Sequence, residues 1–238
     1  MEAPSPTAPS LARPGRAVDP VFAAGAIHLD SEKCYSKAFG MNHQLQTELL
    51  EMQRADLALR QRLANQGTLF GEYNEQMAML HRCHNERFAD ILTEHGWPHR
   101  HLVGDEGTAA AWLVLQHAVL APPLMRSSIL LIERAVNEGS TDPRHLALLV
   151  DRVRTLDGQN QVYGTQHDWD DYGLLSPLPI EDPGNVDARR AAVGMEPLTE
   201  HTKRLRARAQ EEGEFPPADL EAHRREARKW ARSVGWRQ

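Results

Sequence analysis

Five polar side chains lie on or beside apolar helical faces, where their chemistry could support proton transfer or metal binding. They are Asp56 in one predicted helix, His81 and His84 in a second, and the pair Gln116-His117 in a third. A buried polar group is costly unless it has a hydrogen-bond partner. We therefore expect these side chains to meet in one polar site, which is the main candidate for chemistry in this chain.

Two reaction classes are open to these residues. In the first, His117 is the general acid–base group, Gln116 orients it or binds substrate, and Asp56 sets its tautomer. This arrangement needs no cofactor and suits hydrolysis, cyclisation, elimination or isomerisation. In the second, His117 and Asp56 are ligands of a divalent metal. His81 or His84 supplies another imidazole, because two imidazoles and one carboxylate suit zinc or iron.

Structural roles could account for the same residues. Asp56 could pair with Arg60, one turn later, as a strut between helices. His81 could face solvent while His84 is a hydrogen-bonded core histidine. A third interpretation makes the chain a non-catalytic helical binding or interaction module, whose C-terminal helix engages a partner. These alternatives stay open on the sequence alone.

Basic, amide and hydroxyl side chains elsewhere could hold a substrate. Arginine binds carboxylate or phosphate through two parallel hydrogen bonds, so these arginines favour a small acidic substrate and a small-molecule or peptide tailoring enzyme. For Arg189-Arg190 the structural alternative is a strut to a nearby aspartate. The expected substrate-binding residues are Arg60, Arg152, Tyr163, Thr165, Gln166, Asp182, Arg189 and Arg190.

Apolar periodicity predicts the helices that must position these groups. Apolar residues at steps of three, four and seven run from Leu45 to Leu63, with Asp56 completing the stripe, and predict a helix over residues 43–66. A second helix is expected over residues 73–95, ended by Gly96-Trp97-Pro98. Its expected buried face consists of Met77, Leu80, His84, Phe88 and Ile91.

The third helix carries the Gln116-His117 pair. We expect a loop over residues 99–107, Thr108 as the N-cap, and a helix over residues 109–120 that Pro122-Pro123 ends. One face of this helix should consist of Leu113, Gln116, His117 and Leu120. Two further helices are predicted over residues 124–138 and 141–156.

The second half of the chain has a less regular pattern. Residues 157–185 form a long irregular segment that could contain a small β-hairpin, and a loop this long in a folded domain is usually functional or disordered. A short helix over residues 186–193 and a charged helix over residues 219–234 follow. The fold class is mainly α, with three parts: a disordered tail (1–20), a compact helical domain carrying the site (21–198) and a charged C-terminal helical extension (199–238).

Composition argues against several classes of protein. The formal net charge of -6 argues against a general nucleic-acid binder, and no apolar run approaches the roughly 18 residues of a membrane span. The N-terminal tail lacks the apolar centre of a secretory signal, and Cys34 and Cys83 are too few for a disulfide framework. We therefore expect a cytoplasmic protein with no nucleic-acid or membrane partner. A homodimer through the C-terminal helix is one option.

No established catalytic signature is present, but a series of short motifs gives the chain a resemblance. The motifs are Gly96-Trp97-Pro98, Trp112-Leu113 with Gln116-His117-Ala118, Asp151-Arg152-Val153, Gln161-Val162-Tyr163-Gly164-Thr165-Gln166, and Pro179-Ile180 with Asp182, Val186 and Arg189-Arg190. The block from about Leu49 to Leu198 resembles a bacterial family catalogued as a domain of unknown function. The resemblance implies no particular activity.

The chain departs from that family at the residues of the candidate site. Val119 stands where family members often have an acidic residue, and His81 and His84 stand near positions where they often have Asp and Asn. If those positions line one site, this chain carries a different set of donors and acceptors there.

Overall fold

In the computed structural model, residues 40–68 and 74–237 are described, and the predicted first helix is α2 (His43–Asn65). Asn42 caps this helix, because its side-chain carbonyl accepts a hydrogen bond from the Leu45 N–H at 3.0 Å. The buried side of α2 consists of Leu45, Leu49, Met52, Asp56 and Leu63. The apolar stripe is therefore confirmed, and Asp56 is fully buried within it.

Helix α3 (Glu75–His95) has the expected ends but turns a different side inward. Its buried residues are Met77, Ala78, His81, Asn85, Phe88, Ile91 and Leu92. A solvent-facing His81 with a core His84 is therefore wrong, because His81 is 5% exposed and His84 is only half-buried. The reason is that Met77, His81 and Asn85 form a row at steps of four, which points into the domain and carries Leu80 and His84 to its edge.

Helix α4 (Arg100–Gln116) begins well before its expected start. Residues 100–107 are helical rather than a loop, with a kink at Gly104, whose φ and ψ are 71° and 173°. Thr108 is not an N-cap, because it lies inside the helix and its hydroxyl donates to the Gly104 carbonyl oxygen at 2.9 Å. Gly104 instead permits close packing: a Cβ there would lie 3.1 Å from Nε2 of Gln46 on α2.

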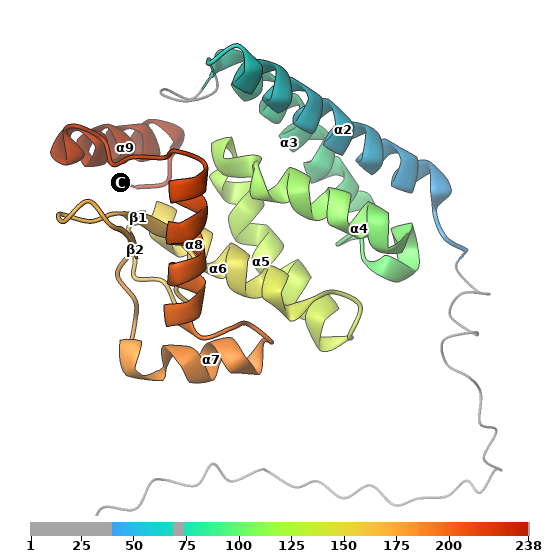
Figure 1. Ribbon diagram of the computed structural model, residues 1–238. Helices are drawn as coiled ribbons and strands as arrows, with labels where there is room; N and C mark the ends of the chain where they lie inside the picture. The colour runs from blue at the N-terminus through green and yellow to red at the C-terminus, as the bar shows by residue number, and fades with distance from the viewer. Residues whose placement is uncertain (1–39, 69–73, 238) are drawn as a thin grey trace, which may run out of the picture.

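The pair Pro122-Pro123 begins a helix rather than only ending one. Helix α4 passes into a short 3₁₀ turn, η1 (Ala118–Leu120), and α5 (Pro122–Asn137) starts directly after it. A proline in the first turn loses no helical hydrogen bond. Helix α6 (Pro143–Leu156) starts as predicted, with Asp142 as its N-cap, and α5 and α6 pack side by side (Figure 1).

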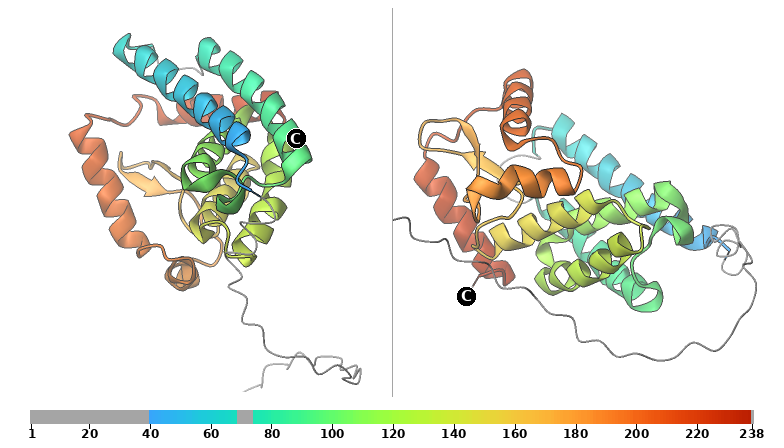
Figure 2. Two further views of the ribbon diagram at one scale, coloured as in Figure 1. Left: turned by 90° about the vertical axis from the view of Figure 1, so that its right-hand side faces the viewer. Right: turned by 90° about the horizontal axis from the view of Figure 1, so that it is seen from below.

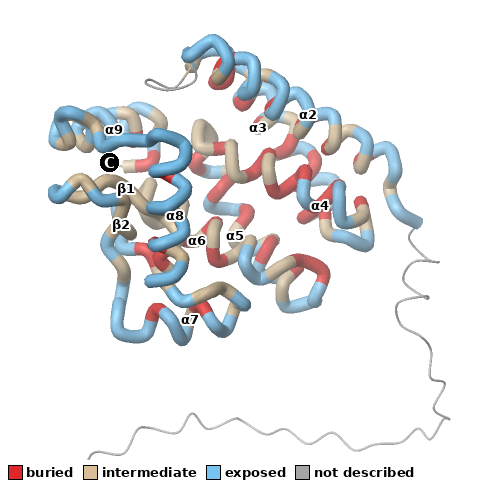
Figure 3. The backbone as a smooth tube through the Cα atoms, in the orientation of Figure 1, coloured by how far each residue is buried: buried red, intermediate tan, exposed pale blue. Residues whose placement is uncertain are grey.

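The hydrophobic core lies among α2, α3, α4, α5 and α6. Figure 3 shows buried residues on the sides of α3, α4 and α5 that face the interior. Within the core, Trp97 packs edge-on against Phe88 and donates from Nε1 to Thr141 Oγ1 at 2.9 Å. The expected buried face of α4 is only half-buried; it consists of Leu113, Gln116, His117 and Leu120. The Gln116-His117 pair therefore lies at the edge of the core.

The irregular segment 157–185 contains the small β-hairpin that the sequence allowed. Strand β1 (His167–Trp169) pairs antiparallel with β2 (Leu175–Pro177), and Trp169 lies opposite Leu175. The Asp170 carboxylate closes the turn, because it accepts hydrogen bonds from the N–H groups of Tyr172 and Leu174, both at 2.9 Å.

A buried carboxylate on α6 shapes the stretch that precedes the hairpin. Asp151 is fully buried, and its oxygens accept hydrogen bonds from the backbone N–H groups of Val162, Tyr163 and Thr165 at 2.7 to 3.2 Å. This stretch has no regular secondary structure of its own. Its conformation is therefore held in large part by hydrogen bonds to this side chain from a neighbouring helix.

The C-terminal part of the chain is helical and packs on the rest of the chain. It comprises η2 (Pro183–Asn185), α7 (Val186–Ala192), α8 (Leu198–Glu211) and α9 (Leu220–Val234). Ala231 and Trp236 belong to the hydrophobic core, and Trp236 donates from Nε1 to the Val119 carbonyl oxygen at 2.7 Å. Two further views show α9 beside the hairpin (Figure 2). The C-terminal end of α9 is thus packed against the rest of the chain.

Some sequence expectations fall on other parts of the chain. The expected disordered tail (1–20), residues 21–39 of the expected helical domain, and Cys34 lie outside the described residues. Cys83 is exposed on α3. Among the helices described, none combines the length and apolarity needed to cross a membrane.

Replacing the buried carboxylate on α6 should destabilise the stretch that it organises. We expect D151A to lower the free energy of unfolding by about 3 kcal/mol or more, because three backbone N–H groups lose a charged acceptor. The control is D90A, at an exposed position on α3, which should change that energy by less than about 0.5 kcal/mol. Urea denaturation followed by circular dichroism measures both. Small and equal effects would contradict the organising role of Asp151.

Candidate functional site

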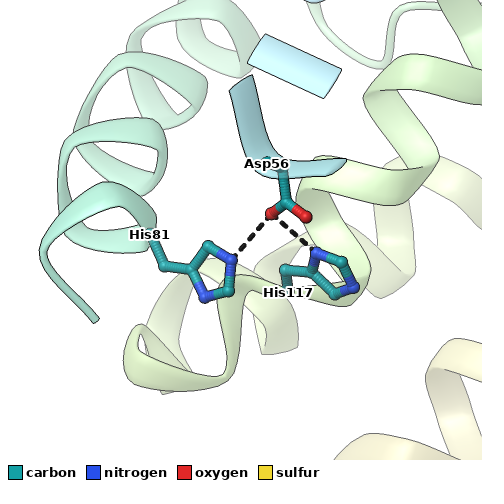
Figure 4. A group of neighbouring side chains, drawn as sticks. All are labelled: Asp56, His81 and His117. Carbon is teal, nitrogen blue, oxygen red and sulfur yellow. Dashed lines mark hydrogen bonds and ion pairs between the residues drawn. The ribbon is translucent and has the colours of Figure 1, made fainter. Parts of the chain in front are cut away.

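Asp56, on the buried side of α2, is contacted by two histidines from other parts of the chain. Its Oδ2 atom lies 2.7 Å from Nε2 of His81 and 2.8 Å from Nδ1 of His117. Figure 4 shows both rings directed at this one carboxylate oxygen. The side chains of Asp56 and His81 are 1% and 7% exposed, whereas that of His117 is 26% exposed. The structure thus brings together three of the five polar side chains, with one edge open to solvent.

Each member of this cluster comes from a different helix. Asp56 lies on the inward face of α2 and His81 on the inward face of α3. His117 is the C-cap of α4, with φ and ψ of -90° and 0°. Because the chain leaves α4 at this residue and turns into η1, the ring is free of the helix face and reaches Asp56.

The hydrogen bonding of Asp56 is uneven between its two oxygens. Both imidazoles contact Oδ2, whereas Oδ1 is buried and has no hydrogen-bond partner among the described residues. An acceptor left in this state costs about 1–3 kcal/mol. The carboxylate therefore keeps capacity for one more donor or for a metal bond.

The Asp56 carboxylate stays ionised despite its burial. Burial raises the pKa of Asp56, but hydrogen bonds from His117 and His81, together with their charge, lower it by more. The net result is a pKa well below the usual value. A full negative charge is thus held in a mostly apolar contact between helices, where a bound cation is favourable.

The charges of the Asp56 cluster affect the pKa of His84. Burial is the main cause that lowers the pKa of His84, while the negative charge of Asp56 opposes that effect. Its Nδ1 atom is buried and has no hydrogen-bond partner in the part of the chain that the structure describes. His84 therefore lies near the cluster, but its nitrogens are not among the ligand atoms that lie within 4.8 Å of one another.

Gln116 and Arg60, both expected at this site, lie elsewhere. Gln116 lines a small space beside Trp112 and Arg152, because successive residues of a helix point about 100° apart. Arg60 is exposed on α2, and within the described ranges no ion pair joins it to Asp56. The expected Asp–Arg strut is wrong, because two histidines supply the donors that the buried carboxylate requires.

The donor types of the three clustered side chains suit a divalent metal ion, which would need Oδ2 and the two nitrogens to lie somewhat farther apart than 2.7 and 2.8 Å. Oδ2 of Asp56, one nitrogen of His81 and one of His117 lie within 4.8 Å of one another. Metal bonds of about 2.0–2.2 Å to nitrogen and oxygen bring ligand atoms to about 3–4 Å from each other. Two imidazoles and one carboxylate suit zinc and non-haem iron. The unused Oδ1 adds a further donor, so the donor set matches this class of ion.

The arginine pair expected to bind substrate is bonded to the protein backbone. Arg190 is 1% exposed and donates to the carbonyl oxygens of Glu196 and Tyr163 at 2.6 and 2.7 Å. Arg189 donates to three carbonyl oxygens, including that of Asp182, and lies 3.6 Å from the Asp182 carboxylate. None of these residues contacts the Asp56 cluster. Their contacts favour the structural alternative.

The other expected substrate-binding residues divide between two places. Tyr163 and Thr165 donate their backbone N–H groups to Asp151. Arg152 and Gln166 line a separate cleft between α6, the hairpin and α9. The structure thus brings Asp56, His81 and His117 into one cluster and places the expected substrate-binding residues elsewhere.

Asp151 and Gln161 are the main organising residues that sequence reasoning missed. Gln161 is fully buried and donates from Nε2 to the carbonyl oxygens of Gln166 and Leu178. Asp151 carries a usable signal, because it lies one step of four after the buried Ala147, as Asp56 does after Met52. Gln161 carries none, because the segment around it has no regular period.

Comparison with known proteins gives one match. A family model described as "Family of unknown function (DUF6624)" matches residues 43–210. This range extends from the first residue of α2 into the last turn of α8, so it includes the Asp56 cluster and the Asp151 framework. No curated protein and no solved structure matches the chain.

His167, in β1, should make the stability of the fold depend on pH. Burial, followed by the positive charge of His201, lowers the pKa of His167 to about 4. The unfolded chain binds this proton more readily, with a pKa of about 6.5, so the stabilisation is complete above that pH and is lost as pH falls toward 4. We expect a loss of about 2 kcal/mol, less than the full shift implies because the ring is only partly buried.

The variant H167Q tests this pH dependence, because glutamine can still bond to Thr202, which His167 contacts at 3.0 Å. The slope of unfolding free energy between about pH 6.5 and 4 should become flatter than in the wild type. H43Q, at an exposed position on α2, should keep the wild-type slope. Denaturant titrations at several pH values give the slopes, and an unchanged slope in H167Q would show that another group is responsible.

Proposed function

We propose that this chain, which belongs to the DUF6624 family of unknown function, is a metal-dependent enzyme whose divalent ion is held by Asp56, His81 and His117. The observation that carries the proposal is the convergence of two imidazoles on one buried carboxylate oxygen (Figure 4). The partnerless Oδ1 of Asp56 supports it further. Zinc and ferrous iron are the ions whose preferred donors match this set.

Several features favour a catalytic ion over a structural one. Structural zinc sites are usually closed by four protein ligands, often cysteines, whereas catalytic sites use three and keep a position for water or substrate. Here three side chains converge, and His117 is exposed on one side. Cys83, on α3, is exposed and does not belong to the cluster. Bound in such a site, a divalent ion lowers the pKa of a water ligand or polarises a substrate oxygen.

The reaction class that fits these residues best is hydrolysis of a small molecule or peptide. Asp56 would offset the charge of the ion, and its partnerless Oδ1 would accept a hydrogen bond from a water molecule at the site. His84, whose Nδ1 has no partner among the described residues, is the neighbouring group that holds a proton or completes the ligand set. The substrate reaches the cluster from the exposed side of His117.

A second candidate, metal-free acid–base catalysis, is favoured by the distances themselves. Separations of 2.7 and 2.8 Å are ordinary hydrogen-bond lengths. In this reading Asp56 holds the Nδ1–H tautomer of His117, and Nε2, which has no hydrogen-bond partner in the described chain, moves a proton of the substrate. This is the first reaction class expected from the sequence.

The compartment, substrate and partners of the enzyme can be inferred from its composition. We infer a cytoplasmic tailoring enzyme with a small acidic substrate and with no membrane or nucleic-acid partner, on the grounds of mild net charge and two cysteines. A homodimer through α9 is left out, because its residue Ala231 and the following Trp236 are buried against the chain's own core.

Metal loading of tag-free protein, first stripped with chelator, tests the metal proposal. We expect about one Zn²⁺ or Co²⁺ per chain by equilibrium dialysis, and visible absorption bands from the Co²⁺ form. D56A, H81A and H117A should each weaken binding by about 100-fold or more, because each removes a ligand.

H43A is the matched control, because His43 is an exposed histidine on the same helix as Asp56. It should bind metal as the wild type does, and circular dichroism should show that all four variants are folded. Binding well below one ion per chain, or unchanged binding by H81A, would contradict a site built from these three residues.

The tautomer of His117 tests the metal-free candidate. In metal-free protein, ¹⁵N NMR of the imidazoles should show the Nδ1–H tautomer, because Asp56 accepts from that nitrogen. D56A should move His117 toward the Nε2–H tautomer while the fold is retained. A predominant Nε2–H tautomer in the wild type would exclude this mechanism. Failure of both tests would leave a non-catalytic helical binding module.

A further inference from the structure

A cleft of about 820 Å³ separates α9 from α6 and the β-hairpin. Its lining includes Arg152 and Leu156 from α6, Trp169 and Leu178 from the hairpin region, and Arg228 and Trp230 from α9. Figures 1 and 2 show α9 lying next to the hairpin. None of the lining residues belongs to the Asp56 cluster, and sites for small molecules usually measure about 300–1,000 Å³. The cleft is therefore a separate site of suitable size.

Arg152 brings an unpaired positive charge to the inner wall of this cleft. Its Nη1 donates to the Gln116 carbonyl oxygen at 2.8 Å, and no carboxylate of the described chain forms an ion pair with it. Burial lowers the pKa of Arg152. Within the described residues only Nη1 has a hydrogen-bond partner, and Arg152 lines the cleft. Its other N–H groups are positioned to bind an anion.

Most other charged groups that line the cleft already have partners. Arg224 pairs with Asp171 at 2.7 Å, and Arg237 donates to two carbonyl oxygens at the end of α6. Asp170 closes the hairpin turn, and Asp168 accepts a backbone N–H and lies 3.5 Å from an α9 imidazole. Arg228, exposed at the rim, has no ion pair among the residues described. The lining cations without an ion pair among the described residues are thus Arg152, Arg228 and Arg237, and the last is held by carbonyl oxygens.

The rest of the cleft wall is apolar and aromatic. Trp169 and Trp230 are the large side chains, and Leu156, Leu178 and Ala227 add aliphatic surface. The planar guanidinium of Arg152 matches the geometry of a carboxylate, and the apolar wall favours a ligand with an apolar body. The lining therefore fits a carboxylic acid that carries an apolar group.

We propose that this cleft binds a small carboxylic acid with an aromatic or aliphatic body. The carboxylate accepts hydrogen bonds from Arg152, the apolar body packs against Trp169 and Trp230, and Arg228 attracts the anion at the entrance. This site is independent of the metal proposal, because it shares no residue with the Asp56 cluster.

Binding of model acids to the full-length protein tests the proposal. The probes are phenylacetate, indole-3-acetate and octanoate, with phenylacetamide as the neutral analogue of the first. We expect saturable binding of at least one acid by calorimetry, a change in tryptophan fluorescence, and about tenfold or more weaker binding of phenylacetamide, since the amide cannot form a charged pair with arginine.

Variants assign the binding to the two arginines. R152Q should weaken acid binding by about tenfold or more, and R228Q by about two- to threefold, because an exposed charge contributes less. R225Q is the control on the same helix, since Arg225 is exposed, pairs with Glu221 and does not line the cleft. If R152Q is unstable, R152K replaces it in this test, because lysine keeps the positive charge but lacks the planar guanidinium.

Three results would overturn the proposal. They are no saturable binding of any of the three acids below about 10 mM, equal affinity for phenylacetate and phenylacetamide, and unchanged affinity in folded R152Q or R152K. The readouts do not involve metal, so a failure here leaves the metal proposal intact, and the reverse also holds.

Discussion

The negative charge of Asp56 lies inside the apolar contact between α2, α3 and α4, and much of the surrounding arrangement compensates it. An unpaired buried carboxylate costs several kcal/mol, so α2 can occupy its place only if donors come from its neighbours. His81 from α3 and His117 from the end of α4 supply them. The rotation of α3, which carries His81 inward, and the point at which α4 ends are both consistent with this requirement.

A second buried carboxylate, Asp151, is neutralised in a different way. Its donors are backbone N–H groups of residues 162–165, which cannot change protonation and do not bind metal. The donors of Asp56 are imidazoles, which can do both. Both carboxylates are buried and need donors. Asp151 therefore organises a backbone segment, whereas Asp56 belongs to a group of side chains that can transfer protons or bind metal. The difference lies in the chemistry of the donors rather than in burial.

The end of α4 connects the two candidate sites. The Gln116 carbonyl oxygen accepts from Arg152 of the cleft, and the next residue, His117, contacts Asp56. Two residues later, Val119 lines the cleft and accepts from Trp236. This short segment therefore has groups on both sides: the backbone carbonyl of Gln116 contacts Arg152, and the side chain of His117 contacts Asp56.

The sequence alone determined most of the helices and the apolar stripe with Asp56 on it, because periodicity and turn residues are local properties. It did not predict the helical state of residues 100–107 or helix α8. Partner choice needed the tertiary structure. Whether His81 or His84 faces inward depends on a rotation of α3 that periodicity does not define closely, since both residues lie near the edge of one apolar face. Arg60 lies only one turn after Asp56 along the chain, yet the donors come from residues 25 and 61 positions away. Gly104 looks like a loop signal locally and is instead a point of close helix contact. Each of these outcomes depends on distances between helices, and such distances are set only when the whole core packs.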